Sequence, residues 1–349
     1  MATAALSERR MLTPTVTAQQ RLIDAANAGD ERAFEELVAP HRRLLQAHCY
    51  RMLGSAYDAE DAMQETLLRA WRSLSAYQGR SALRSWLYKI ATNVCLRTLE
   101  RRPGGRVRVL PADHGPATDP RAPLEAPLVE STWIEPYLAQ VTDAADDAAG
   151  VETRYEQRES VELAFIAALQ HLPARQRAVL ILRDVLGFSG AEVADALETT
   201  PASVYSALQR AHEAVHRRLP ERSQQATLRS LGDAQLEDLV RAYVRAWEND
   251  DVAGLATLLT EDAILAMPPT PSWYRGREAI LAGLRAHALN GQERWRLTPT
   301  RANGQLAVIA DVWEPTAGAF VPVHTAVLTL RGGLISHIDT FIAPSHLNG

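Results

Sequence analysis

The hydrophobic residues of this chain change their spacing once along its length, and that change limits what the chain can fold into. Up to residue 219 they recur every three or four positions, which is the period of amphipathic helices. After a polar stretch at 220–233, helical patterns give way to alternating runs typical of strands. The helical patterns and then the strand-like runs are 236–249, 252–259 and 279–289, then 305–313, 320–330 and 334–341. A helical part followed by an α+β domain is therefore predicted.

The helical part divides into two blocks. In the first, the periodicity predicts one helix over 34–53, a second over 58–74 and a third over 83–99. Together they indicate a compact all-helical domain over residues 22–102.

The second block, residues 156–220, has the outline of a helix-turn-helix. Ser189 and Glu192 have the spacing of a capping box, which predicts a short helix ending at Leu197. Pro201 is favoured at the first position of the longer helix that follows, through Leu219. Such a pair of helices places the second one in a DNA major groove, although similar three-helix units also occur in proteins that do not bind DNA.

We expect residues 103–155, between the two blocks, to form an acidic, proline-rich linker. Seven of the 19 prolines fall within 103–150, where little periodicity is present, so we expect a long tether and not a buried element. Residues 133–137 are too aromatic for a purely disordered segment. They predict either packing on a domain or a docking motif.

The net charge of −5 conceals two opposite blocks. Residues 1–109 have a net charge of +6, and residues 110–150 have a net charge of −7. Clustered positive charge suits a nucleic-acid partner, which the total alone would disfavour. Only two cysteines, no secretory signal and no apolar run of 18 residues predict a cytoplasmic protein that does not enter a membrane.

Between Tyr77 and Arg108 aromatic side chains alternate with basic ones, including Trp86, Lys89 and Arg97. Aromatic faces that stack on unpaired bases, beside cations that hold the backbone, are what single-stranded nucleic acid requires. The alternative is a solvated basic face above tryptophans of the core.

Two motifs carry a resemblance to a known family. Residues 58–71 (DAEDAMQETLLRAW) and 77–93 (YQGRSALRSWLYKIATN) resemble region 2 of the extracytoplasmic-function sigma factors of bacterial RNA polymerase. Residues 172–177 (LPARQR) and the helix-turn-helix after them resemble region 4. The resemblance covers about residues 22–219.

The C-terminal region, residues 234–346, is similar to SnoaL-like polyketide-cyclase domains of the NTF2-like fold. Four short segments carry this similarity: Ala246–Glu248, Leu258–Ala263, Met267–Pro269 and Trp273–Arg277. The whole chain thus resembles sigma factors with a fused SnoaL-like cone domain. The fold class is multidomain: all-α region 2, all-α region 4 and an α+β domain.

The resemblance implies a role for each motif. The helix over 58–74 would dock on the β′ clamp of core RNA polymerase through Asp58, Asp61, Gln64, Glu65, Leu68 and Trp71. Region 2 would capture and melt the −10 element through Tyr77, Arg80, Ser81, Leu83, Trp86, Lys89, Asn93 and Arg97. Region 4, a partner of the β flap, would read the −35 element through Thr200, Ser203, Tyr205, Ser206, Gln209 and Arg210. Tyr205 and His212 occupy positions at which many relatives have a basic side chain, so contacts with DNA phosphates would be weaker there.

The family also implies a role for the linker, because in sigma factors it threads the positively charged channel of the polymerase. A polyanionic strand can occupy that nucleic-acid path until RNA displaces it. The alternative is a linker that only keeps the chain soluble.

The C-terminal domain offers candidate pocket residues but no catalytic group. Its relatives use Asp or His in the mouth of a cone, which here points to Trp247, Tyr274, His287, Asp311, His324 and Asp339. No triad or metal-ligand spacing appears in the sequence, so we expect no enzyme activity, no metal and no cofactor. We expect the domain to contact the sigma regions or their linker and to modulate their activity, with or without a small ligand.

The sequence therefore predicts a sigma factor that binds core RNA polymerase and directs promoter recognition, −10 melting and initiation. Two alternatives stay open. One is a SnoaL-type enzyme or ligand sensor with a DNA-binding appendage, and the other is a helix-turn-helix regulator that acts without polymerase.

Overall fold

The computed structural model describes residues 18–77, 82–102, 107–128, 132–138 and 162–343. Region 2 is helical, as predicted. Its elements are α1 (Ala18–Asn27), α2 (Glu31–Val38), η1 (Ala39–His41), α3 (Arg42–Leu53), α4 (Ala56–Ser73), η2 (Leu74–Ala76) and α5 (Leu83–Glu100).

The single helix expected over 34–53 is wrong, because the 3-10 turn η1 separates α2 from α3. Pro40 lies in this turn, and a proline inside an α-helix removes a backbone donor and clashes with the preceding turn. Helix α3 then ends at Gly54, whose φ is 70°. A Cβ on Gly54 would lie 2.9 Å from the Gln170 side chain, so both the turn and the close approach of region 4 require glycine here.

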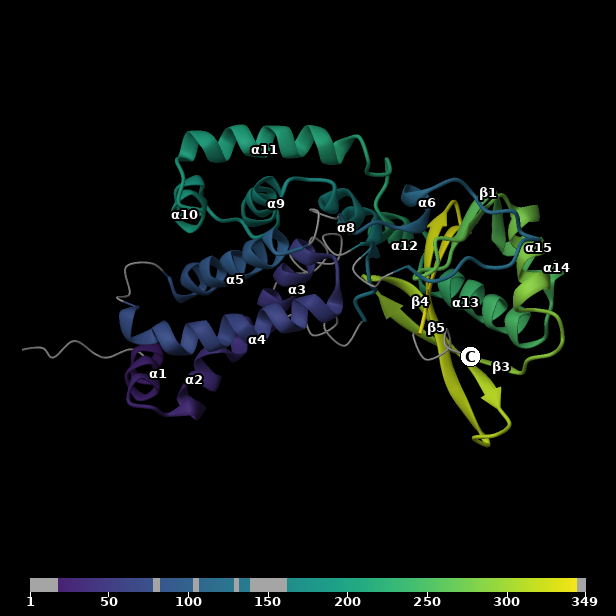
Figure 1. Cartoon of the computed structure of the whole chain (residues 1–349), viewed down its shortest axis with the longest axis horizontal. Coiled ribbons are helices and arrows are strands. Elements are labelled where there is room, and N and C mark those ends of the chain that lie inside the picture. The colour runs from purple at the N-terminus through teal and green to yellow at the C-terminus, as the bar shows by residue number, and fades with distance from the viewer. Residues whose placement is uncertain (1–17, 78–81, 103–106, 129–131, 139–161, 344–349) are drawn as a thin grey trace, which may run out of the picture.

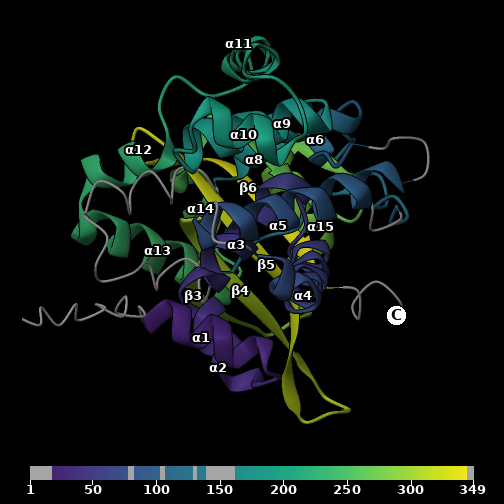
Figure 2. The same ribbon diagram turned by 90° about the vertical axis from the view of Figure 1, so that its left-hand side faces the viewer.

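Region 4 contains the predicted helix-turn-helix. Its elements are α8 (Leu163–Gln170), α9 (Ala174–Leu180), a π-helical turn η6 (Ile181–Val185), α10 (Gly190–Ala196) and α11 (Pro201–His216). The predicted capping box of Ser189 and Glu192 at the start of α10 is confirmed. Thr200 caps α11, which lies outermost in this region, above α9 and α10 (Figures 1 and 2).

Regions 2 and 4 share one hydrophobic core. Leu87 and Ala91 of α5 belong to the same buried cluster as Ile166 and Leu169 of α8. The buried guanidinium of Arg177 on α9 joins the two regions, because it donates to the carbonyl of Met52 and to the side-chain oxygen of Gln170. The two regions are therefore packed as one unit in this structure.

The C-terminal region has four helices and a six-stranded sheet. Its elements are α12 (Gln224–Leu231), α13 (Asp233–Glu248), α14 (Val252–Leu258), β1 (Leu259–Ala266), β2 (Trp273–Arg275), α15 (Arg277–His287), β3 (Trp295–Ala302), β4 (Gln305–Glu314), β5 (Ala319–Arg331) and β6 (Leu334–Ile342). The strand order is β2-β1-β6-β5-β4-β3, and only β1 and β6 pair in parallel. The sequence patterns missed α12, β1, β2 and β3.

The sheet is covered on both faces. Helices α13, α14 and α15 bury one face, where Tyr243 and Ile280 of the helices belong to the same core as Leu328 of β5. The opposite face contributes Ala307 and Val327 to the core of the sigma regions. Figure 1 shows the sigma helices and helices α14 and α15 on opposite sides of the sheet.

The expectation of an unpacked linker is wrong for residues 107–128 and 132–138. Short helix α6 (Pro111–His114) is followed by a segment without regular secondary structure, in which Thr118 and Leu128 donate backbone hydrogen bonds to the carbonyls of Trp273 and Pro269. Of the two alternatives for residues 133–137, packing on a domain is confirmed: Trp133, Ile134 and Tyr137 are buried. Burial of these apolar side chains holds the segment on the domains, although its prolines and acidic residues suggested a tether.

Among all residues that the structure describes, no helix is both long enough and apolar enough to cross a bilayer.

Replacing Arg177 with methionine should lower the free energy of unfolding by about 3 kcal/mol, because buried acceptors on both regions lose their donor. Urea unfolding measures this. Arg175→Met is the matched control: Arg175 is exposed and makes one 3.3 Å hydrogen bond, to the carbonyl of Leu197. The Arg175→Met variant should lose about 0.5 kcal/mol of unfolding free energy or less. Equal losses for the two variants would contradict the assignment.

Candidate polymerase and promoter interface

One exposed row of side chains runs along α4. Asp61, Gln64 and Leu68 are exposed and lie on one helix face because they are three and four positions apart. Leu68 is 42% exposed, which is unusual for a leucine in a packed helical domain. Glu65 beside them is bonded to Arg69 at 2.6 Å, one turn away on the same helix. This row is a candidate contact surface for a protein partner.

Two of the predicted docking residues are engaged inside the molecule. The Asp58 carboxylate accepts from Arg102 at 2.6 Å and from Arg108 at 2.9 Å. Trp71 packs its ring edge-to-face on Phe34, with ring centroids 5.1 Å apart. Asp58 is therefore tied to the linker, and Trp71 contributes to the packing of α2 on α4.

The residues predicted to read the −10 element cluster at the start of α5. Tyr77 and Trp86 lie against each other, with ring centroids 5.2 Å apart, and Leu83 is buried in the core against which both rings pack. Asn93 is half-buried and Arg97 is exposed farther along the helix. Arg80 and Ser81 lie outside the described residues.

Region 4 covers part of this helix, through what we call the α5–α10 contact. Lys89 forms an ion pair with Asp195 at 3.1 Å, and Ser85 donates to Glu192 at 2.9 Å. Arg84 donates to the carbonyl of Leu186 at 2.6 Å, and its guanidinium lies 4.3 Å from the ring centroid of Phe188. Cationic and polar groups of α5 are thus paired with protein groups of region 4.

The residues predicted to read the −35 element lie on the opposite side of the helix-turn-helix and are exposed. Thr200 caps α11, and its hydroxyl lies 3.0 Å from that of Ser203. The others follow on the outward face: Tyr205, Ser206, Gln209 and Arg210. Tyr205 is 56% exposed and packs beside Gly190, which fixes the angle between α10 and α11.

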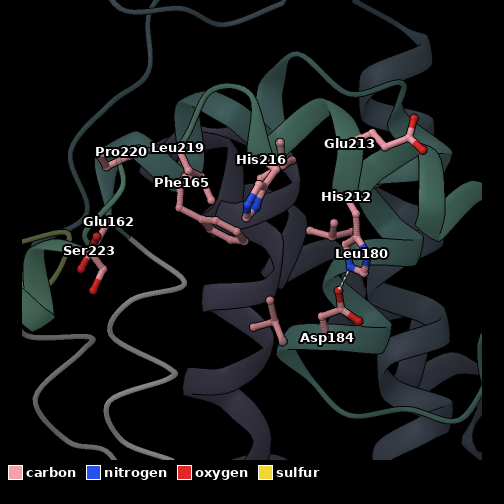
Figure 3. A pocket seen from close by; sticks show the side chains of 12 residues that line it. Glu162, Phe165, Leu180, Asp184, His212, Glu213, His216, Leu219, Pro220 and Ser223 are labelled. Atoms are coloured by element: carbon pink, nitrogen blue, oxygen red, sulfur yellow. Dashed lines mark hydrogen bonds and ion pairs between the residues drawn. The ribbon is translucent and has the colours of Figure 1, made fainter.

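An apolar groove of about 790 Å³ lies beside the other half of α11. Phe165 of α8, Leu180 of α9 and Leu219 line it, and Asp184 pairs with His212 at its edge (Figure 3). Because the residues predicted to read the −35 element occupy the first half of α11, they lie apart from this groove on the same helix.

The six candidate pocket residues of the C-terminal domain do not meet in one pocket, which corrects the expectation. Trp247 and His324 lie on the face covered by α13, where their rings are 5.6 Å apart and both contact Trp295. Tyr274 is also buried there, against Gly283 of α15. His287, at the end of α15, is half-buried with no partner for its Nε2 atom.

The two aspartates lie on the other face of the sheet, because side chains alternate along a strand. Asp311 is bonded to Arg296 at 2.6 Å. Asp339 pairs with Val327 across the strands, faces the sigma regions and lines a second cavity. Among the described residues, no three His, Cys, Asp or Glu side chains are placed to hold a metal ion.

Region 2, the linker and the sheet meet at a buried cluster around Tyr50, which we call the junction. Tyr50 Oη donates to the carbonyl of Glu135 at 2.8 Å and accepts from Asn303 Nδ2 at 2.7 Å. Asn303 Oδ1 accepts from the backbone of Tyr137 at 2.9 Å, and the Tyr50 and Tyr137 rings stack 4.6 Å apart. Burial raises the pKa of the Tyr50 hydroxyl, which therefore stays protonated as a donor.

Sequence reasoning missed the residues that join the domains. The sequence predicts only a capping role for Glu192 and no contact for Asp195 or Asn303, and it places Arg108 in the basic run expected to bind nucleic acid. The one available signal is the Asn303-Gly304 pair directly before the strand-like run 305–313, because such a pair marks a tight turn. It does not say what the turn contacts.

Comparison with known families agrees with the three-part architecture. Residues 37–103 match Sigma-70 region 2, residues 162–215 match Sigma-70 region 4, and residues 240–338 match the SnoaL-like domain. Over 335 residues the chain is 42% identical to the ECF RNA polymerase sigma factor SigG of Mycobacterium tuberculosis, covering 93% of this chain and 87% of the relative. The chain belongs to the extracytoplasmic-function sigma factors of RNA polymerase.

Two further similarities fit this membership. The sigma factor SigE of Mycolicibacterium smegmatis is 31% identical over 203 residues, which cover 57% of this chain and 66% of that protein. The crystal structure of the Mycobacterium tuberculosis extracytoplasmic function sigma factor SigJ has the same fold, with a TM-score of 0.54 at 19% identity over 88% of this chain and 95% of that chain. This sigma factor therefore binds core RNA polymerase and directs it to promoters.

The exposed row of α4 gives a prediction that separates contact from packing. Leu68→Ala should weaken binding to core polymerase about tenfold with little loss of stability, because it truncates the exposed apolar side chain of the row. Trp71→Ala should instead lower the free energy of unfolding by about 2 kcal/mol, because it removes the packing on Phe34. Fluorescence anisotropy with labelled sigma factor and thermal unfolding measure the two effects.

Glu36→Ala on α2, an exposed position away from this row, is the control and should change neither quantity. Normal core binding by Leu68→Ala would exclude this face of α4 as the polymerase contact.

Proposed function

We propose that this sigma factor is closed when free and that core polymerase opens it. In the open form the exposed row of α4 docks on the β′ clamp, the groove beside α11 receives the β flap, α5 reads and melts the −10 element, and α11 reads the −35 element. The α5–α10 contact is the observation that carries this proposal, because promoter DNA and region 4 would use the same groups of α5.

The contact opposes −10 binding through charge. Lys89 is paired with a carboxylate, and a phosphate would have to replace Asp195 to gain the same interaction. Arg84 is likewise committed to a carbonyl and an aromatic face. Region 4 must move away from α5 before both groups can serve DNA.

The linker opposes clamp binding in the same way. Asp58 lies in the predicted docking set, and Arg102 and Arg108 already neutralise it. Arg108 also reaches Glu135, which accepts at 2.6 Å from Ser55 at the start of α4. Docking on the clamp would compete with this network and so loosen the linker, whose acidic stretch then threads the polymerase channel.

The SnoaL-like domain acts in this proposal as a regulatory support and not as an enzyme. The junction makes its sheet part of the closed form, while rings of Trp247, Trp295 and His324 fill the covered face of the sheet. Asp311 is ion-paired and lies on the other face, so it does not form an acid–base pair with His324. Action with core polymerase also implies a cytoplasmic location.

Weakening the α5–α10 contact should favour the open form. The double variant Glu192→Gln, Asp195→Asn removes both charges and keeps a capping-box residue at position 192. Two exposed polar contacts together contribute about 1 kcal/mol, so the rate of association with core polymerase should rise about fivefold. Stopped-flow fluorescence measures the rate, and solution scattering should show a larger radius of gyration.

Glu237→Gln on α13 removes one exposed charge away from the contact and from the groove beside α11, and should leave both measurements unchanged. A double variant that behaves like this control would rule out the closed form as a barrier to polymerase.

Disrupting the junction should change transcription without touching a DNA-reading residue. Asn303 has a φ of 53°, so Asn303→Gly removes its hydrogen bonds without adding backbone strain. We expect a changed transcript level or promoter choice when reconstituted holoenzyme transcribes genomic DNA and the transcripts are mapped, both for this variant and for deletion of residues 234–349. Unchanged transcription by both would refute a regulatory role for the domain.

A further inference from the structure

A cavity of about 750 Å³ lies where the linker, region 4 and the sheet meet. Asp113 of α6, Ala167 of α8, Leu231 of α12 and Asp339 of β6 line it from four different elements. It lies on the face of the sheet turned toward the sigma regions, so it is separate from the cone interior filled by Trp247 and Trp295.

Asp339 is the unusual group in this cavity. The residue is 6% exposed, and no described residue donates a hydrogen bond to its carboxyl group. Burial, together with the nearby carboxylate of Asp113, raises the pKa of Asp339 to about 7. A buried carboxyl group without a donor or a cation is costly unless a partner from outside satisfies it.

The basic residues around the cavity are engaged elsewhere. Arg331 pairs with Asp262 at the rim, while Arg218 and Arg222 donate to carbonyls of Ala214 and Ala226. The histidines that line the cavity, His171 and His337, have pKa values lowered by burial and nearby arginines, so they are largely neutral at pH 7. No basic group of the described chain thus compensates Asp339.

We propose that this cavity binds a small organic cation, with its ammonium group at Asp339 and Asp113 and its apolar body against Ala164, Ala167, Leu231 and Ile264. The two carboxyl groups come from different domains and converge where a cation could bridge them. The apolar walls suit a hydrocarbon chain. The cavity volume is enough for a molecule of moderate size, and a metal ion would lack a third ligand.

A ligand in this cavity would contact the linker, region 4 and the sheet together. It would therefore favour the closed arrangement by its differential affinity for it, a consequence that rests on the function proposed above. Binding itself is measured on the purified full chain without polymerase, so a negative result leaves the transcription predictions standing.

Three probes of equal length test the proposal by calorimetry at pH 8: hexylammonium, 1-hexanol and hexanoate. Hexylammonium should bind most tightly. Asp339→Asn should weaken its binding at least tenfold and leave 1-hexanol unaffected, because a charged hydrogen bond is lost. Asp238→Asn on α13, an exposed acidic position, is the matched control and should change nothing.

Acidity supplies a second readout. Hexylammonium stays protonated from pH 8 to pH 6, whereas Asp339 gains a proton over that range, so binding by the wild-type chain should weaken about tenfold. Any protonation of His171 and His337 near pH 6 would also weaken hexylammonium binding, because it adds positive charge to the cavity wall. The Asp339→Asn variant should lose most of this pH dependence.

Asp113→Asn keeps the proposal falsifiable if Asp339→Asn does not fold, because Asp113 is exposed and its loss should weaken hexylammonium binding about threefold. Equal affinities for hexylammonium and 1-hexanol would overturn the proposal. So would tighter binding of hexanoate, which would assign the cavity to its arginine rim, or unchanged binding by both aspartate variants.

Discussion

The arrangement of this sigma factor depends on one buried hydrogen-bonded cluster, the junction at Tyr50. Its phenol is satisfied from both sides, by the linker carbonyl of Glu135 and by the amide of Asn303 in the β3–β4 turn. Removing any one of these partners by mutation would leave a buried polar group unpaired, which costs more than each hydrogen bond contributes when made. The junction therefore specifies where the SnoaL-like sheet lies on region 2, and the face of the sheet then determines what region 4 can contact.

Charge adds a second constraint in the proposed function, because DNA binding and the closed form would use the same groups. Lys89 and Arg84 suit phosphates and bases, and region 4 supplies Asp195, Glu192 and the Phe188 ring as internal substitutes. These contacts are partly exposed and individually weak, so they can exchange for polymerase and promoter contacts. The apolar core shared by the two regions is less easily exchanged, so the proposed opening would have to separate it as a unit.

Much of this could be predicted from the sequence because it depends on neighbours along the chain. The capping box at Ser189, the proline at the start of α11 and the periodicity of α4 and α5 are local patterns, and the family motifs lie on them. Helix α12 and strands β1 to β3 were missed because their patterns are short. The break at Pro40 was missed because the apolar stripe continues through it.

The sequence by itself determined the three-part order, the helix-turn-helix and the family, since each is carried by residues close together in the chain. The tertiary structure alone decided which charges are paired, because the partners of Asp58 and Lys89 come from segments 44 or more residues away. The tertiary structure also places Asp339 and His324 on opposite faces of one sheet, because side chains alternate along a strand. Long-range pairing and sheet faces depend on packing, which local pattern does not encode.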